Sequence, residues 1–191
     1  ARGYRLCRDP RLAALAWRSA NTDASALRLE NDLFEKDPDG LAKEIAAAAR
    51  QEPFRLASDH LSRYGQAYVQ TERPENGRAL WIHYGYAKGH SHHDCLAIGL
   101  YAKNIDMMPD LGYPEFTGSW PKRHAWTANT VSHNTLLVGD QRSAYSPGGK
   151  LKLFVAEPPL RVMDASSSTA YPGLEAYRRT VVLVDVSDTD S

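Results

Sequence analysis

From residue 66 onward the sequence is a series of short apolar runs separated by turn residues, and this pattern limits the possible folds more than any other feature. Asn76-Gly77 separates the runs 66–71 and 79–84, and Asn-Gly between two such runs is a strong hairpin signal. Many short strands joined by turns form an antiparallel β-sandwich or a curled sheet. We therefore expect a mainly β fold. The further expected strands are residues 95–103, 105–108, 135–140, 151–156, 160–164 and 179–186.

The first 60 residues have a helical pattern instead. Asp9-Pro10 and Asp37-Pro38 each supply an N-cap and a first-turn proline, and apolar or alanine-rich sequence at helical spacing follows both. Residues 23–34 are a weaker helical candidate. Two or three helices do not close a domain, so we expect them to pack on the next region or on further chain. We divide the chain into a helical segment, 1–60, and an antiparallel β-sandwich domain, 61–191.

Composition excludes several classes of protein. The 191 residues are 42% hydrophobic, enough to bury a core, and 23 basic residues balance 23 acidic ones. Because no net field attracts nucleic acid or anionic lipid, an anionic ligand must be held by local charge. The sequence contains neither a run of about 18 apolar residues nor a signal-peptide pattern. We expect a globular chain that binds no nucleic acid and does not insert into a membrane.

Two further features concern the ends of the chain and its cysteines. Residue 1 is Ala rather than Met, and the last residues directly follow a β-branched run, so we expect a piece of a longer polypeptide. Cys7 and Cys95 lie far apart in unlike contexts, which argues against a CxxC site or a disulfide framework. Both are expected to be buried free thiols.

Residues 83–135 hold six of the seven histidines, in three polar clusters joined by hydrophobic sequence: 85–94, 109–113 and 132–135. If the backbone around His90 is extended, the alternation of side chains puts His90, His92 and Asp94 on one face. Such histidines can both approach one metal ion, or one can bind the metal and the other the substrate. The spacing is compatible with either arrangement.

The second and third clusters supply the further donors that a metal site needs. Zinc takes three or four ligands from segments that the fold brings together. His92, Asp110 and His133 meet this need with a water or substrate oxygen, and Asp94 and Asn134 could orient the imidazoles. The simpler interpretation is a solvated histidine-rich loop, a turn-capping aspartate and a hydrogen-bonded histidine at a strand entrance.

The ordered motifs Gly-His-Ser-His-His-Asp, Asp-Leu-Gly-Tyr and Ser-His-Asn-Thr resemble those of the heparinase II/III family of polysaccharide lyases, over roughly residues 58–186. Members of this family join an α/α toroid to an antiparallel β-sandwich and cleave uronic-acid-containing polysaccharides by β-elimination between the two. The resemblance implies that residues 1–60 correspond to the last toroid helices, and the rest to a truncated sandwich. It also implies a bacterial enzyme that is periplasmic or secreted.

The resemblance assigns roles to individual residues. His90 matches the histidine that faces the substrate carboxylate, whereas His92, Asp110 and His133 match the ligands of a mainly structural zinc ion. The other catalytic residues of the family come from earlier toroid helices and have no counterpart here. β-Elimination removes the C5 proton beside a carboxylate, which favours cations and hydrogen-bond donors around the acidic sugar. The candidates for substrate binding are Tyr113, Trp120, Arg123 and His124.

Other residues near these candidates have a simpler explanation. Lys88 and Lys122 could add positive charge for an acidic sugar, but an ordinary solvated loop is the more economical interpretation of both. Trp120 and Trp126 suit stacking on sugar rings, although single tryptophans more often pack in a core or at its rim. These lysines and tryptophans therefore do not decide between a catalytic and a non-catalytic function.

The sequence favours a zinc-containing part of a lyase that acts on an acidic polysaccharide. The alternative is a non-catalytic carbohydrate-binding β-sandwich in which zinc only stabilises the structure. It is preferred if half of the cleft between toroid and sandwich is truly missing. A metal-dependent hydrolase is disfavoured because residues 90–94 lack the His-x-His-x-Asp-His spacing of binuclear hydrolases. No feature predicts the uronic acid, the linkage or an oligomeric state.

Overall fold

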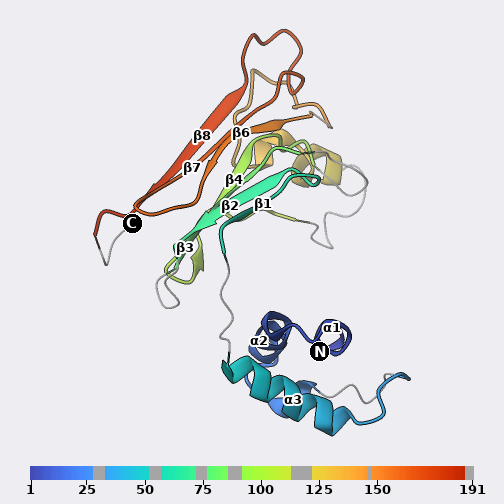
Figure 1. The fold of residues 1–191 in the computed structure, drawn as a ribbon. Helices are drawn as coiled ribbons and strands as arrows, with labels where there is room; N and C mark the ends of the chain where they lie inside the picture. Colours follow the sequence, from blue (N-terminus) through green and yellow to red (C-terminus); the bar gives the residue numbers. More distant parts are fainter. Residues whose placement is uncertain are drawn as a thin grey trace. The chain divides into compact units, whose positions relative to one another are not determined.

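The structure, a computed structural model, describes residues 1–27, 33–51, 57–71, 77–85, 92–112, 122–145 and 148–187. The chain divides into two compact units, Ala1–Leu56 and Ala57–Ser191. The first is helical, and the described part of the second contains two antiparallel sheets (Figure 1). The fold class expected from the sequence, a few helices followed by antiparallel sheet, is therefore confirmed.

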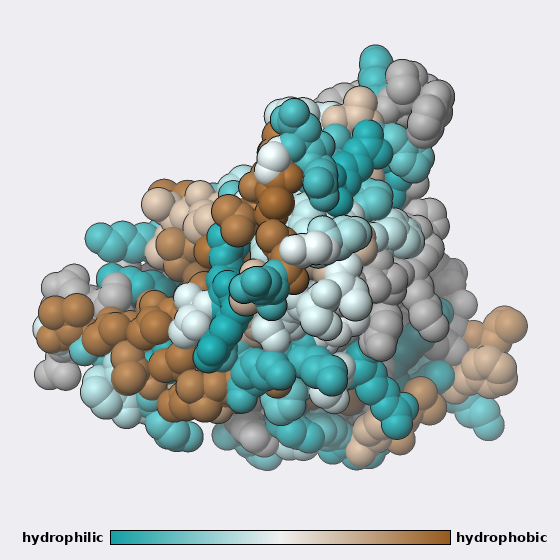
Figure 2. Space-filling model, turned by 90° about the horizontal axis from the view of Figure 1, so that it is seen from above, coloured by the Kyte–Doolittle hydropathy of each residue, from teal (hydrophilic) through white to brown (hydrophobic). Residues whose placement is uncertain are grey.

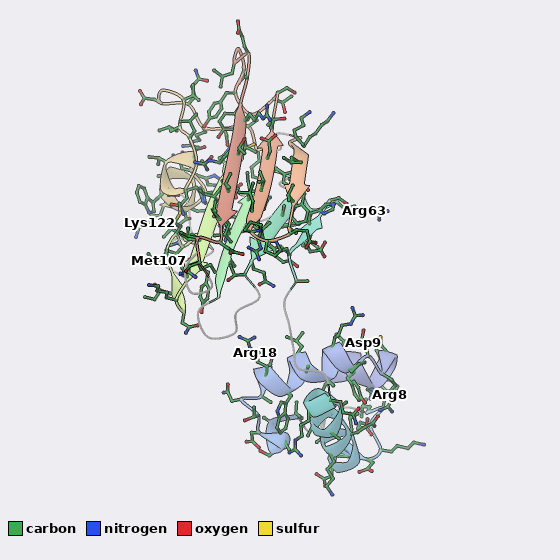
Figure 3. All side chains as sticks on the ribbon, turned by 60° about the vertical axis from the view of Figure 1, so that its left-hand side comes forward. Arg8, Asp9, Arg18, Arg63, Met107 and Lys122 are labelled. Carbon is green, nitrogen blue, oxygen red and sulfur yellow. The ribbon has the colours of Figure 1, made fainter. Side chains whose placement is uncertain are left out.

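The helical unit begins its main helices at the aspartate-proline pairs. Asp9 precedes α2, and its carboxylate accepts a hydrogen bond from the Arg11 backbone N–H at 2.9 Å, as an N-cap should. Arg8 and Asp9 lie together where α1 meets α2 (Figure 3). Of the weaker candidate, the described residues form only a short 3₁₀-helix, η1. The elements are α1 Arg2–Cys7, α2 Pro10–Ser19, η1 Ala24–Leu27 and α3 Pro38–Gln51.

The apolar faces of these helices form a small core of their own. Helical spacing brings the buried side chains of α2 and of α3 to one face of each helix. Cys7, at the end of α1, is exposed, so the expectation that both cysteines are buried was wrong for it. No described helix is long and apolar enough to cross a lipid bilayer. The core consists of Tyr4, Ala13, Ala14, Leu27, Leu41, Ala42, Ile45 and Ala49.

The first sheet has its strands in chain order, each antiparallel to the next. The two runs that flank Asn76-Gly77 pair with each other, with Gln70 opposite Ala79, so the predicted hairpin partners are confirmed. Lys103 and Asn104 both have positive φ, 51° and 62°, which matches the tight turn expected at Asn104. The strands are β1 Asp59–Leu61, β2 Gln66–Gln70, β3 Arg78–His83, β4 Ala97–Ala102 and β5 Ile105–Asp106.

The second sheet consists of β6 Lys150–Val155, β7 Leu160–Ser166 and β8 Arg178–Val184, again in chain order. Strands β2 and β7 contact each other, and one core lies between the two sheets. Figure 2 shows that hydrophobic side chains also reach the surface among hydrophilic ones. The core includes Val69, Leu80, Ile82, Met163, Ala165 and Leu183.

The strand expected at residues 135–140 is absent, and only an isolated bridge joins Val138 to Gln141. Side chains distant in sequence bond instead to the backbone of this segment at Leu136. The hydroxyls of Tyr171 and Tyr177 lie 2.9 and 3.3 Å from the carbonyl oxygen of Leu136. The Leu136 carbonyl is therefore satisfied without a neighbouring strand.

Candidate metal centre

Three residues from separate loops lie close together in the second unit. His92 lies in the segment before β4, Asp110 follows β5, and His133 follows the 3₁₀-turn η4, Thr130–Ser132. One ligand atom of each lies within 4.8 Å of the corresponding atoms of the other two. The structure thus brings together the residues that the sequence proposed as metal ligands.

Asp110 is the centre of this group. Its Oδ2 lies 2.8 Å from Nδ1 of His133, and its Oδ1 lies 3.9 Å from Nδ1 of His92. The two imidazole rings are 4.9 Å apart between centroids and inclined at 39°. The backbone N–H of Gly112 donates a hydrogen bond to Oδ1 of Asp110 at 2.6 Å, and its φ of +58° is a conformation that favours glycine.

The donor atoms fit a cation. The Nε2 atoms of His92 and His133 are buried, and neither has a hydrogen-bond partner in the described part of the chain. Leaving a buried polar atom unpaired costs about 1–3 kcal/mol, and an ion bound by the imidazoles would remove part of this cost. Two imidazole nitrogens and a carboxylate oxygen are ligands that zinc accepts, with one position left for water or another oxygen.

The electrostatics of the group favour the metal-binding protonation states. Burial lowers the pKa of His92, and the nearby His133 lowers it further, against the opposing effect of Asp110. Burial by itself would raise the pKa of Asp110, but hydrogen bonds from His133 and Gly112 together outweigh it, so this pKa is lowered. Near neutral pH, His92 is therefore neutral and Asp110 ionised, as metal coordination requires.

Asn134 supports the centre in a different way from that expected. Its side-chain amide donates to the carbonyl oxygens of Met108 at 3.1 Å and Pro109 at 3.4 Å, the residues just before Asp110. Its own carbonyl oxygen accepts a hydrogen bond from the backbone N–H of Ile98 on β4 at 3.2 Å. Asn134 therefore ties the Asp110 loop to the sheet, whereas the sequence suggested that it orients an imidazole.

Asp94, the other expected orienting residue, pairs with a histidine outside the three. Its Oδ2 lies 3.0 Å from Nδ1 of His83 on β3. Both residues line a pocket of about 220 Å³ beside the metal centre. His83 was not among the predicted site residues, although its alternation with Trp81 in a predicted strand places both on one face. The pocket is lined by Tyr64, Gln66, Trp81, His83, His92, Asp94 and Asp110.

The remaining predicted site residues have different outcomes. Arg123 is buried on the π-helical turn η3, Arg123–Thr127, and is close enough to His92 to lower its pKa. His124, on the same turn, is exposed. Lys122 and Met107 project from the same side of the sandwich in the view of Figure 3. Three predicted residues lie outside the described part of the chain: His90, Tyr113 and Trp120.

His93 contacts a different part of the structure from its neighbour His92. Its Nδ1 lies 2.7 Å from the carbonyl oxygen of Ser143, and its ring contacts Tyr145 edge to face. It does not belong to the group formed by His92, Asp110 and His133. Adjacent histidines thus serve different parts of the structure, one at the metal centre and one against a loop.

Residues 80–187, more than half of the chain, match the family described as Heparinase II/III-like, C-terminal. The chain belongs to this family, which is a family of polysaccharide lyases. The alginate lyase of Stenotrophomonas maltophilia (strain K279a) is 29% identical to it over 137 residues, which cover 63% of this chain and 17% of that protein.

Solved structures show the same fold. The heparan sulfate lyase HepC from Pedobacter heparinus superimposes with a TM-score of 0.62 at 17% identity, covering 93% of this chain and 26% of HepC. A heparinase III structure superimposes with a TM-score of 0.61 at 18% identity, covering 88% of this chain and 27% of its own. The chain thus spans about a quarter or less of the length of these relatives.

Proposed function

We propose that this chain is part of a polysaccharide lyase, comprising the last toroid helices and the sandwich, and that the whole enzyme cleaves a uronic-acid-containing acidic polysaccharide by β-elimination. The observation that carries the proposal is the family match over residues 80–187. The relatives described above support it, because their names refer to alginate and heparan sulfate, both acidic polymers. We extend the proposal to the location of the protein, which on the same grounds is periplasmic or secreted.

The metal in this proposal is zinc, held by His92, Asp110 and His133. The buried nitrogen atoms without partners and the ionised carboxylate support it. When bound, zinc would cross-link the three segments that carry its ligands and so add to the stability of the fold. The residues around it keep their own tasks: Gly112 and Asn134 fix the loop of Asp110, and no proton transfer is assigned to the ligands.

Substrate handling in the proposal rests on residues outside the ligand set. By the family resemblance, His90 faces the carboxylate of the sugar whose C5 proton is removed, so that charge developing there is stabilised. Arg123, buried near His92, is suited to hold an acidic group in place, since a guanidinium forms two parallel bonds to a carboxylate. The proton-transferring base and acid are proposed to come from toroid helices, as in the family.

The test combines elemental analysis with an ultraviolet assay for the double bond that β-elimination creates. Alginate and heparan sulfate are the substrates, starch is the neutral control, and any longer natural polypeptide containing this chain is assayed in parallel. Zinc with rising absorbance on an acidic polymer supports the proposal. If the protein contains zinc and binds an acidic polymer, but neither this chain nor the longer polypeptide raises the absorbance, the alternative is favoured. That alternative is a non-catalytic carbohydrate-binding sandwich stabilised by zinc. A zinc-free protein removes the assignment of the three ligands.

A further inference from the structure

The outer face of the first sheet carries an aromatic and polar group beside the metal centre. Strand pairing sets Gln66 opposite His83 and Trp81 opposite Gly99. Because side chains alternate along a strand, Trp81 and His83 share one face of β3, whereas Leu80 and Ile82 point into the core on the other. The outer face thus presents a ring system and a hydrogen-bonding group in neighbouring positions.

Trp81 lies flat over the backbone of the next strand. A Cβ atom added at Gly99 would overlap the indole ring of Trp81, so the ring occupies the space that a side chain at this position would take. The indole is only partly buried there. A tryptophan held against a sheet in this way offers a firm apolar surface for stacking.

His83 is held in one orientation. Its Nδ1 lies 3.0 Å from Oδ2 of Asp94, and the Tyr64 ring stacks on the imidazole with centroids 5.7 Å apart and planes inclined at 27°. The Asp94 oxygen accepts the hydrogen bond from Nδ1–H of His83, so Nε2 is the ring nitrogen left for a ligand. This Nε2 is buried and has no hydrogen-bond partner within the described residues.

The two features belong to one pocket, and the pocket defines the class of ligand. Its volume of about 220 Å³ is below the roughly 300–1,000 Å³ of drug-sized sites, which suits a single small ring. The ligand needs an apolar face for Trp81 and a hydroxyl hydrogen for His83. Asp94 and Asp110 also line the pocket, so a ligand carboxylate is disfavoured next to them and hydroxyl groups are favoured there. A sugar ring that enters with its hydroxyl groups meets all these requirements.

We propose that Trp81 and the His83–Asp94 pair form a sugar-binding subsite beside the metal centre. In it the ring stacks on Trp81, and Nε2 of His83 accepts a hydrogen bond from a sugar hydroxyl. His83 is not one of the three residues whose donor atoms meet at the metal centre, so its role is separate from metal binding. The inference rests on the proposed function, because a polysaccharide substrate supplies the ring.

The test compares two variants that differ in one property. His83→Gln keeps an acceptor near the position of Nε2, whereas His83→Leu removes it at similar volume. The measurement is calorimetric binding of alginate and heparan sulfate tetrasaccharides, with zinc content and thermal unfolding recorded for every variant. We expect His83→Leu to weaken binding about three- to tenfold, the effect of one hydrogen bond, and His83→Gln to restore most of it. Trp81→Leu is the second variant, because it leaves His83 in place.

The matched control is His60→Leu, since His60 lies on β1 of the same sheet and does not line the pocket. Binding equal to wild type in both His83→Leu and Trp81→Leu overturns the subsite and leaves the proposed function standing. Loss of zinc from His83→Leu also overturns it, because His83 would then act through the metal. Weakened binding by both variants, with no elimination product from any longer natural polypeptide that contains this chain, keeps the subsite and removes the lyase activity. A wild-type chain that binds neither tetrasaccharide removes both.

Discussion

Nδ1 of His133 lies 2.8 Å from Oδ2 of Asp110, although the two residues are 23 positions apart in the sequence. Asp110 also faces His92, so three loops converge on one carboxylate. None of the three residues is in a strand, and their placement depends on hydrogen bonds such as those of Asn134. A cation at this point would join segments that the sheet itself does not hold together.

Replacing His92 by Ala is expected to release the metal and lower stability. A ligand present at about 100 times its Kd stabilises the native state by roughly 2.7 kcal/mol, which corresponds to several degrees in Tm for a chain of this size. Elemental analysis and thermal unfolding, with and without a chelator, measure both effects. His93→Ala is the matched control, since His93 bonds to the Ser143 carbonyl and should keep the metal. Full metal content in His92→Ala would exclude His92 as a ligand.

The metal-free protein should lose stability as the pH falls below the ordinary pKa of histidine. Burial lowers the pKa of His92 in the folded chain, so below about pH 6.5 the unfolded chain binds the proton more readily than the native one. Stability therefore rises with pH through this window and is complete above it. Urea unfolding of chelator-treated protein between about pH 7.5 and about pH 4.5 measures the change. In His92→Ala the free energy of unfolding should depend less on pH than in the wild type. An equal dependence on pH in both proteins would contradict the prediction.

Local signals explain why much of the sandwich could be predicted. The short apolar runs predicted β2 and β3 as strands, and the Asn-Gly between them predicted that the two strands pair as a hairpin. Asn104 predicted the turn between β4 and β5. These features depend on residues close in sequence, so no knowledge of the whole fold is needed. The aspartate-proline pairs predicted the starts of α2 and α3 for the same reason.

Features set by distant residues could not be predicted. Residues 135–140 have the composition of a strand, but hydroxyls from Tyr171 and Tyr177 take the backbone bonds near Leu136. Strand β1 has only exposed residues and therefore no alternation to detect. The partnership of His83 with Asp94 depends on how the segment after β3 returns to the sheet, which no local spacing encodes. The choice of His92, Asp110 and His133 relied on the order of motifs as well as on residue type.

Cys95 is expected to be unreactive in the native chain, whereas Cys7 should react at once. Burial raises the pKa of the Cys95 thiol to about 12, so almost no thiolate is present at neutral pH, and Cys7 is exposed. A disulfide reagent should label one thiol per native chain quickly and two in denaturant. Cys7→Ser should abolish the fast phase. Two fast thiols in the native protein would show that Cys95 is accessible.

Asp164 should contribute to the stability of the second sheet as a buried carboxylate. It is 1% exposed, and it accepts hydrogen bonds from Nε of Arg178 at 2.8 Å and from the Thr180 hydroxyl at 2.9 Å, both on β8. Hydrogen bonds to a charged group contribute about 1.5–3 kcal/mol, so Asp164→Asn should lower the free energy of unfolding by roughly 2 kcal/mol.

The same carboxylate should make the free energy of unfolding depend on pH in acid solution. The hydrogen bond from Arg178 lowers the pKa of Asp164 below its usual value near 3.8, so the stabilisation is complete above that pH and is lost as the pH falls through the lowered pKa. Urea unfolding at neutral pH and at about pH 3 should therefore show the difference between wild type and Asp164→Asn shrinking in acid. Thr180→Val, which removes one hydrogen-bond donor to the carboxylate and keeps the ion pair with Arg178, should cost less at neutral pH. A difference that stays constant down to acid pH would mean that the carboxylate acts through packing rather than through its charge.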